Sequence, residues 1–305
     1  MVIEDSKRDT RTRLTFHIVL AFLAIYFVWG STYLAIRIVV ATVPPLFAAG
    51  VRFTLAGAAL YLWARVRGIP APSHHEWRSL SVMGALMFLV AYAGLFWAEK
   101  TIPSGVASVL VATIPVWTSV FEVFVFKKAQ LRLPLVLAVC LGLLGVGILA
   151  SNSGLGKLNL LACAAILVAE ISWSFGTVLS KSLALPASKV MSAAGQMLTG
   201  GLMLLVSSTA AGELHPFPRL SFEAGAALLY LIVAGSLLAF TAYIWLLGRM
   251  SATKVASYAY VNPVVALAIG YWFGGEALTP RTFLGTGLVL ASIVLLLGNF
   301  GKKPA

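Results

Sequence analysis

The sequence predicts an all-α, polytopic membrane protein of ten transmembrane helices, arranged as two five-helix repeats of inverted topology. Composition is the first reason: of 305 residues, 60% are hydrophobic and only 10% are charged, whereas a soluble domain carries about 25% charged residues. The second reason is that the apolar residues fall into ten segments long enough to cross a bilayer. The third is that the second half of the chain repeats features of the first half in the same order.

Ten spans are predicted because about 20 apolar residues cross a bilayer as a helix. Clusters of charge, proline and glycine separate segments of about this length. Ser73 and Glu76 form a capping box that opens the third segment, and Thr279-Pro280 places a capping hydroxyl before a first-turn proline at the tenth. The predicted spans are 16–38, 44–64, 77–98, 104–126, 133–150, 158–180, 188–210, 222–247, 253–273 and 281–299.

The basic residues are unevenly divided between the two sides of the membrane. If the spans alternate in direction, sixteen of the 22 Lys and Arg residues lie on the side that holds both termini, five lie on the other, and Arg52 lies within a span. Cytoplasmic loops carry such an excess. We therefore expect a multi-pass inner-membrane protein with both termini in the cytoplasm. The net charge of +12 reflects this topology, and no nucleic-acid-binding motif accompanies it.

Short motifs of the first half recur in the second half, in order, at offsets of 144–151 residues. We predict a duplication, with the first repeat at residues 1–152 and the second at 153–305. Each repeat has five spans, an odd number, so the two repeats have opposite orientations, as in secondary transporters with a substrate site near the midplane. The matches pair Trp29–Arg37 with Trp173–Lys181, Ala48–Gly50 with Ala193–Gly195, Gly84 with Gly235, Ala91–Tyr92 with Ala242–Tyr243, Val106–Ser108 with Val255–Ser257 and Pro115 with Pro263.

Four motifs resemble those of a known family. Phe27–Thr32 (FVWGST), Gly50–Ala56 (GVRFTLA), Tyr258–Val264 (YAYVNPV) and Gly275–Leu278 (GEAL) are similar to motifs of the drug/metabolite transporter superfamily, in its ten-span type with two EamA repeats. The resemblance implies a solute exporter of the inner membrane. Aromatic residues on several spans resemble the branch that exports aromatic and other amino acids. The chain departs from the family's pattern at Lys127-Lys128, which aligns with Gly275-Glu276.

Glu170 lies near the middle of the sixth predicted span. An ionised carboxylate there costs about 2.5–3.5 kcal/mol, so it should face a wet cavity, pair with another group or be protonated. Trp173, Ser174 and Thr177 share its helix face, and this stripe should point inward. Three roles are open: attraction of a substrate ammonium, transfer of a proton that drives export, or a structural hydrogen bond.

The first span carries the corresponding stripe of Tyr26, Trp29, Thr32 and Tyr33. Tyr26 is the counterpart of Glu170, so the site would be charged on one side only. Aromatic faces also suit an aromatic or ammonium-bearing solute. We expect spans 1, 3, 4, 6, 8 and 9 to line a central cavity. The candidate substrate-binding residues are Tyr26, Trp29, Tyr33, Tyr92, Glu170, Trp173, Thr177, Tyr243, Tyr258 and Asn262.

Pro115 and Pro263 occupy equivalent positions in the fourth and ninth spans. Each proline frees the carbonyl four residues earlier, which belongs to Val111 or Ala259. Because a free carbonyl is costly in lipid, we predict that these prolines are gating or kink positions on a transport pathway. A bent packing helix is the structural alternative.

Two other charged residues and two whole spans favour structural roles. Arg52 could bind a substrate carboxylate, but its place in the family motif favours an architectural role. Glu122 lies near Lys127 and Lys128 at the end of the fourth span, which favours an interfacial ion pair or a snorkelling side chain. The fifth and tenth spans are rich in glycine, and neither Leu135–Ala150 nor Leu284–Leu297 holds a charge or an aromatic ring. Small residues allow close helix packing, which predicts a scaffold or a dimer contact.

The sequence favours a secondary transporter that exports small metabolites, above all amino acids including aromatic ones, by alternating access. Export of drugs or other metabolites, and import, are alternatives within the same family. A membrane enzyme or a channel is less favoured, because Glu170 lacks a catalytic partner motif and rings of charge are absent. His74, His75 and Glu76 fit a cap better than a metal site, and no cofactor motif is present. The expected partners are a small-molecule substrate, the bilayer and candidate coupling protons, with the chain as a monomer or a homodimer.

Overall fold

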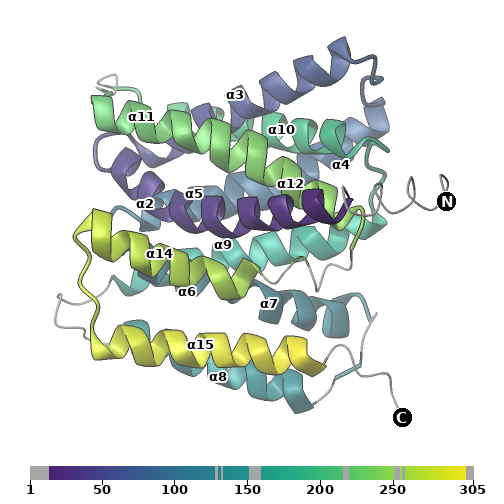
Figure 1. Ribbon diagram of the computed structural model, residues 1–305. Coiled ribbons are helices and arrows are strands. Elements are labelled where there is room, and N and C mark those ends of the chain that lie inside the picture. The colour runs from purple at the N-terminus through teal and green to yellow at the C-terminus, as the bar shows by residue number, and fades with distance from the viewer. Residues whose placement is uncertain are drawn as a thin grey trace, which may run out of the picture.

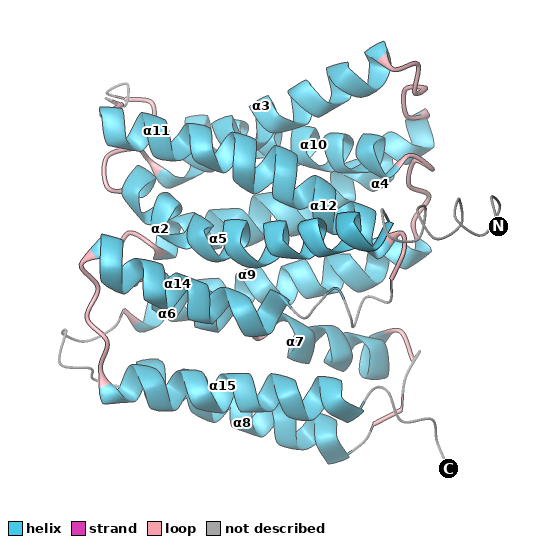
Figure 2. Cartoon of the chain, in the orientation of Figure 1, coloured by secondary structure: helices cyan, strands magenta, loops and turns pink. Residues whose placement is uncertain are grey.

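The computed structural model describes residues 14–127, 130–131, 133–150, 159–215, 220–250, 255 and 258–299. All regular structure within these residues is helical (Figure 2). Three apolar helices of 10–17 residues lie at Leu133–Leu149, Val261–Gly274 and Pro280–Leu295, where the fifth, ninth and tenth spans are predicted. Seven longer helices are apolar enough to cross a membrane: Leu14–Val40, Pro45–Val66, His74–Ala98, Ser104–Val125, Leu160–Ser182, Lys189–Ala210 and Phe222–Leu246.

The all-helical membrane class is therefore confirmed, while the count of ten spans and the inverted repeat stay predictions. In the described chain, π-helical segments interrupt three helices, at η1 (Ala24–Val28), η2 (Ala85–Val90) and η5 (Leu231–Leu238), and a fourth segment, η3 (Phe121–Val125), ends the helix that contains α7. One short 3₁₀ segment, η4 (Ser180–Ser182), follows α9. The α-helices are α2 (Trp29–Val40), α3 (Pro45–Val66), α4 (His74–Gly84), α5 (Ala91–Ala98), α6 (Ser104–Val111), α7 (Ile114–Val120), α8 (Leu133–Ala150), α9 (Leu160–Leu179), α10 (Lys189–Ala210), α11 (Phe222–Tyr230), α12 (Ala239–Leu247), α14 (Tyr258–Gly274) and α15 (Pro280–Asn299).

The helices lie side by side in one bundle (Figure 1). The end of the bundle at the left of that view is called the distal end. The helix α2 ends there, and the helices α3, α6 and α15 begin there. α8 and α15 pack against each other along one side of the bundle. This pairing agrees with the scaffold role predicted for the fifth and tenth spans.

α3 and α10 make the most extensive helix contact in the described chain. Two glycines bring their backbones together. A Cβ at Gly57 would lie 2.5 Å from the backbone nitrogen of Leu198, and a Cβ at Gly201 would lie 2.4 Å from the backbone nitrogen of Thr54. Small residues at a crossing allow this close approach between helices in a membrane.

Both predicted helix caps are present. The Ser73 hydroxyl accepts from the backbone N–H of Glu76 (3.3 Å), and the Glu76 carboxylate accepts from the backbone N–H of Ser73 (2.7 Å). The Thr279 hydroxyl accepts from the backbone N–H of Thr282 (3.2 Å) before α15. Each cap satisfies a donor that the first helical turn leaves without a partner.

Lys127 and Gly275, which the alignment of the two halves pairs, both have left-handed backbones, with φ of 52° and 62°. Gly275 adopts this conformation without strain because it has no Cβ. A lysine there costs about 1–2 kcal/mol. The first half of the chain therefore keeps the turn although it lacks the glycine.

Candidate functional site

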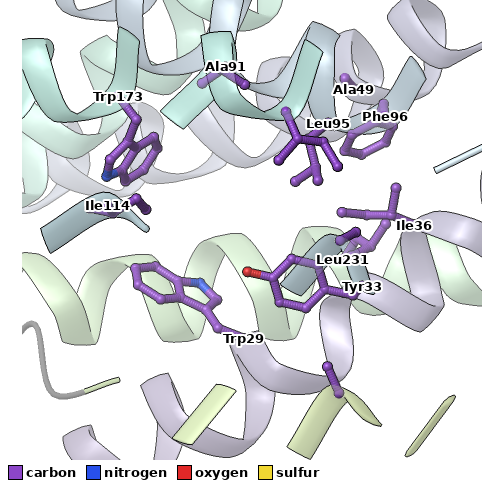
Figure 3. Close-up of a cluster of buried hydrophobic side chains, with 14 of the residues drawn as sticks. Trp29, Tyr33, Ile36, Ala49, Ala91, Leu95, Phe96, Ile114, Trp173 and Leu231 are labelled. Atoms are coloured by element: carbon purple, nitrogen blue, oxygen red, sulfur yellow. The ribbon is translucent and has the colours of Figure 1, made fainter. Parts of the chain in front are cut away.

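A cavity of about 530 Å³, including space open to solvent, lies inside the bundle. Figure 3 shows Trp29 and Tyr33 on one side of the space, facing Trp173, Ala91 and Leu95 on the other, with the Tyr33 hydroxyl directed inward. The lining residues are Trp29, Thr32, Tyr33, Ile36, Ala91, Tyr92, Leu95, Val111, Ile114, Glu170, Trp173, Tyr258 and Asn262.

The lining comes from five of the six spans expected to form it. Seven of the ten candidate substrate-binding residues line the cavity: Trp29, Tyr33, Tyr92, Glu170, Trp173, Tyr258 and Asn262. The missing span is the eighth, whose Tyr243 stands behind the wall, 5.2 Å from the Trp29 ring and 6.1 Å from the Tyr258 ring between centroids.

The other two candidates also lie outside the lining. The Tyr26 ring packs near Phe22, with 5.5 Å between centroids. The Thr177 hydroxyl donates to the carbonyl of Trp173 (2.9 Å), one turn earlier in α9. Of the polar stripe on α9, Glu170 and Trp173 thus line the cavity, whereas the Thr177 hydroxyl bonds to the backbone of its own helix.

Glu170 is the only carboxyl group among the described residues that line the cavity, and it is 4% exposed. Among the described residues it has no ion-pair partner and no side-chain hydrogen bond. Such an arrangement is costly for a charge in a membrane protein and typically marks a functional site. The structural hydrogen bond considered from the sequence is therefore not observed in the described part of the chain.

Aromatic rings form both sides of the cavity. Trp29 lies 5.2 Å from Tyr258 and at an edge to it, and Tyr92 lies 6.0 Å from Trp173, measured between ring centroids. The faces of aromatic rings carry partial negative charge. Together with the Glu170 carboxylate they make the cavity attractive to a cation.

Arg52 does not line the cavity. Its Nε donates to the Ser236 hydroxyl (3.0 Å), and its guanidinium packs over the rings of Phe53 and Tyr92, at 4.6 and 5.3 Å. The side chain is 1% exposed. Arg52 therefore joins α3 to η5, which supports the architectural role over contact with substrate.

Carbonyls of the π-helical segments accept hydrogen bonds from two cavity residues, Trp29 and Asn262, and from Ser172, which is adjacent in sequence to the cavity residue Trp173. A π-helical turn leaves carbonyls without their usual α-helical partners. The Trp29 indole donates to the carbonyl of Gly235 in η5 (3.1 Å), and the Ser172 hydroxyl donates to the carbonyl of Leu86 in η2 (2.8 Å). The Asn262 amide, with its nitrogen facing η1, donates to the carbonyls of Ile25 (3.1 Å) and Tyr26 (3.0 Å).

Pro115 and Pro263 differ in their effect on the helix that contains them. Pro115 is the second residue of α7, directly after a break in the fourth span. α6 ends at Val111 and α7 starts at Ile114, and both of these residues line the cavity. Pro263 lies within the continuous helix α14. Only the fourth span is broken at its proline.

Glu276 at the distal end was not singled out as a site residue by the sequence. Its carboxylate accepts from the backbone N–H groups of Ser104 (2.7 Å) and Gly105 (3.1 Å) and pairs with Arg37. It thereby caps α6 and ties that helix to α2 and to the α14–α15 connection. The family motif Gly275–Leu278 was the signal present in the sequence, but the contacts depend on which segments meet in space.

Glu99 is a second buried acid near this end, one residue beyond the third span. It is 1% exposed, and neither of its carboxylate oxygens has a hydrogen-bond partner among the described residues. Burial, followed by the negative charge of Glu276, raises the pKa of Glu99 well above its usual range. No sequence signal marks it, because Glu99-Lys100 resembles an ordinary charged loop.

Glu122 pairs with Lys181 at 2.9 Å between Oε1 and Nζ, and both side chains are partly exposed. The ion pair predicted for Glu122 is therefore present, with Lys181 as its partner. Exposed pairs of this kind contribute about 0–1 kcal/mol, which makes Glu122→Gln a matched control for other glutamate substitutions.

Glu276→Gln should lower the free energy of unfolding by about 1–3 kcal/mol. Glutamine keeps one acceptor oxygen but loses the charge that holds two backbone donors and Arg37. The unfolding midpoint of the purified protein in detergent measures the effect, with Glu122→Gln as the control. Equal midpoints for the two variants would show that the Glu276 contacts do not stabilise the distal end.

The helical bundle and its internal cavity, with a membrane-embedded carboxylate that has no ion-pair partner among the described residues, are typical of membrane transporters. The profile of the EamA-like transporter family matches residues 16–151 and again 160–298. The chain belongs to this family.

The chain is similar to a curated protein that carries a transporter name and to a solved structure. The chain is 38% identical over 290 residues to the uncharacterized inner membrane transporter YedA of Escherichia coli (strain K12), covering 93% of this chain and 92% of that protein. It is 29% identical over 275 residues to protein PecM of Dickeya dadantii (strain 3937), covering 88% of each. A solved crystal structure with 19% sequence identity superimposes with a TM-score of 0.65 over 93% of this chain and 99% of the other, which shows the same fold.

Proposed function

We propose that this protein is an inner-membrane secondary transporter that exports small metabolites, with amino acids, aromatic ones included, as the principal substrates. The observation that carries the proposal is the Glu170 carboxylate, buried without an ion-pair partner among the described residues, in a cavity walled by aromatic rings. A small solute with an ammonium group and an apolar side chain complements both features.

The mechanism is alternating access between two five-span repeats, 1–152 and 153–305, around this cavity. Two observations support the division: the family profile matches the chain twice, and the paired residues Lys127 and Gly275 share a left-handed backbone. The uneven distribution of Lys and Arg supports cytoplasmic termini. The gradient of the solute or of protons supplies the energy.

Uptake of a labelled amino-acid panel into proteoliposomes tests the proposal, with protein-free liposomes as the control. We expect saturable uptake of phenylalanine and several neutral amino acids, together with counterflow when unlabelled substrate is loaded inside. Saturation and counterflow separate a transporter from a channel. If no amino acid enters above the control, the substrate assignment is wrong, and the same assay is then applied to other metabolites and drugs.

A further inference from the structure

The charges around the cavity are one-sided. Glu170 contributes a carboxylate, whereas the described residues that line the cavity include no Lys, Arg or His. Arg52, the buried basic residue within the second-span motif Gly50–Ala56, is held by Ser236 and by the rings of Phe53 and Tyr92. Tyr92 itself lines the cavity, so the guanidinium packs behind the wall that the substrate would meet.

The neutral donors of the wall are partly used inside the protein. The Trp29 indole donates to Gly235, the Thr32 hydroxyl donates to the carbonyl of Trp29 (2.6 Å), and the Asn262 amide donates to the carbonyls of η1. Of the described lining side chains, an anion in the cavity could accept hydrogen bonds only from the tyrosine hydroxyls and from the Trp173 indole N–H. That N–H has no partner among the described residues. A carboxylate that enters such a site loses water without gaining an opposite charge, which is unfavourable.

An ammonium group finds the opposite conditions. The Glu170 carboxylate can accept its protons, and the rings of Trp29, Tyr258 and Trp173 can surround its alkyl or aryl body. Cations are attracted to such ring faces, and most strongly where water is excluded.

We propose that the cavity recognises a protonated amine attached to an apolar or aromatic body and does not require a carboxylate on the substrate. The proposal rests on the function proposed above and names the chemical group that the same site selects. It predicts that an amine lacking the carboxylate binds more tightly than the amino acid with the same side chain.

Three ligands that share a phenylethyl body test this: phenethylamine, L-phenylalanine and 3-phenylpropanoate. Their dissociation constants are measured on the purified full-length protein at neutral pH by the change in tryptophan fluorescence, since Trp29 and Trp173 line the cavity. We expect phenethylamine to bind about tenfold more tightly than phenylalanine, and 3-phenylpropanoate to bind most weakly. Tighter binding of phenylalanine, equal binding of 3-phenylpropanoate, or no binding of phenethylamine would overturn the proposal.

Variants of Glu170 show whether its carboxylate causes the preference for amines. Glu170→Gln should weaken phenethylamine binding about tenfold or more, whereas Glu170→Asp, which keeps the charge, and Glu122→Gln should change it much less. An unchanged affinity in Glu170→Gln overturns the assignment to Glu170. Because the ligand series is measured on the wild type, the selectivity for amines is tested even where a variant folds poorly.

Transport in proteoliposomes distinguishes this inference from the proposed function. If phenethylamine binds best but no member of the series shows counterflow, the site assignment stands and the transport assignment fails. If phenylalanine shows saturable counterflow and phenethylamine neither competes nor binds, the transport assignment stands and the amine inference fails.

Discussion

Replacing Gly57 by leucine is expected to leave little correctly folded protein. A Cβ at this position would lie 2.5 Å from the backbone nitrogen and 2.8 Å from the Cα of Leu198, and 3.0 Å from the carbonyl oxygen of Ala194. Because these are backbone atoms of α10, the clash cannot be relieved by a change of side-chain rotamer. The helices α3 and α10 must therefore separate, although they form the most extensive helix contact in the described chain. We expect a loss of about 3 kcal/mol or more.

Gly147→Leu is the matched control, since a Cβ at Gly147 meets nothing within 4 Å. Leucine is a better helix former than glycine by roughly 1 kcal/mol, so this control should be as stable as the wild type or slightly more so. The two variants are compared by the yield of monodisperse protein in detergent and by its unfolding midpoint. A Gly57→Leu protein with a wild-type midpoint would contradict the α3–α10 contact.

Glu170→Gln is expected to give the largest effect on transport. Removing the Glu170 carboxylate, the one carboxyl group among the described lining residues, should reduce substrate exchange by about two orders of magnitude if Glu170 binds the substrate ammonium. Counterflow in proteoliposomes measures exchange without a proton gradient. Glu122→Gln, which removes a glutamate from a surface ion pair, should retain wild-type exchange.

Other outcomes assign Glu170 differently. A variant that keeps exchange but loses uptake driven by a pH gradient would make Glu170 the proton carrier. A variant that keeps both activities in proportion to its folded fraction would make the carboxylate structural. The three roles considered for Glu170 therefore give three different patterns in the same pair of assays.

The sequence predicted the membrane class and the position of the apolar helices because bilayer thickness sets the length of an apolar run. It also predicted most of the cavity lining, since helical periodicity places Glu170 and Trp173 on one face of the sixth span. The same periodicity places Trp29 and Tyr33 on one face of the first span. Thr177 was predicted to belong to the same site, but a hydroxyl in a membrane helix readily bonds to its own backbone, as the contact with Trp173 shows.

Other features depend on tertiary contacts that no local pattern encodes. The π-helical segments lack a sequence signature. The sequence therefore did not predict that Trp29 and Asn262 donate hydrogen bonds to carbonyls of these segments. Pro115 and Pro263 have the same local chemistry, yet only the helix with Pro115 is broken. Glu99 and Glu276 are far apart in the sequence, and only folding brings both acids into the buried distal end.

The central claim is that the cavity around Glu170 is where substrate binds, and protection of a cysteine in its wall tests this most directly. Val111 lines the cavity, whereas Ala210 lies exposed at the end of α10. Each is changed to cysteine in a background where Cys140 and Cys163 are replaced by alanine, and the rate of maleimide labelling is measured with and without a saturating transported solute. We predict that the solute slows labelling of Val111→Cys and leaves Ala210→Cys unchanged, and that Glu170→Gln abolishes the protection. Equal labelling of Val111→Cys with and without the solute would contradict the claim.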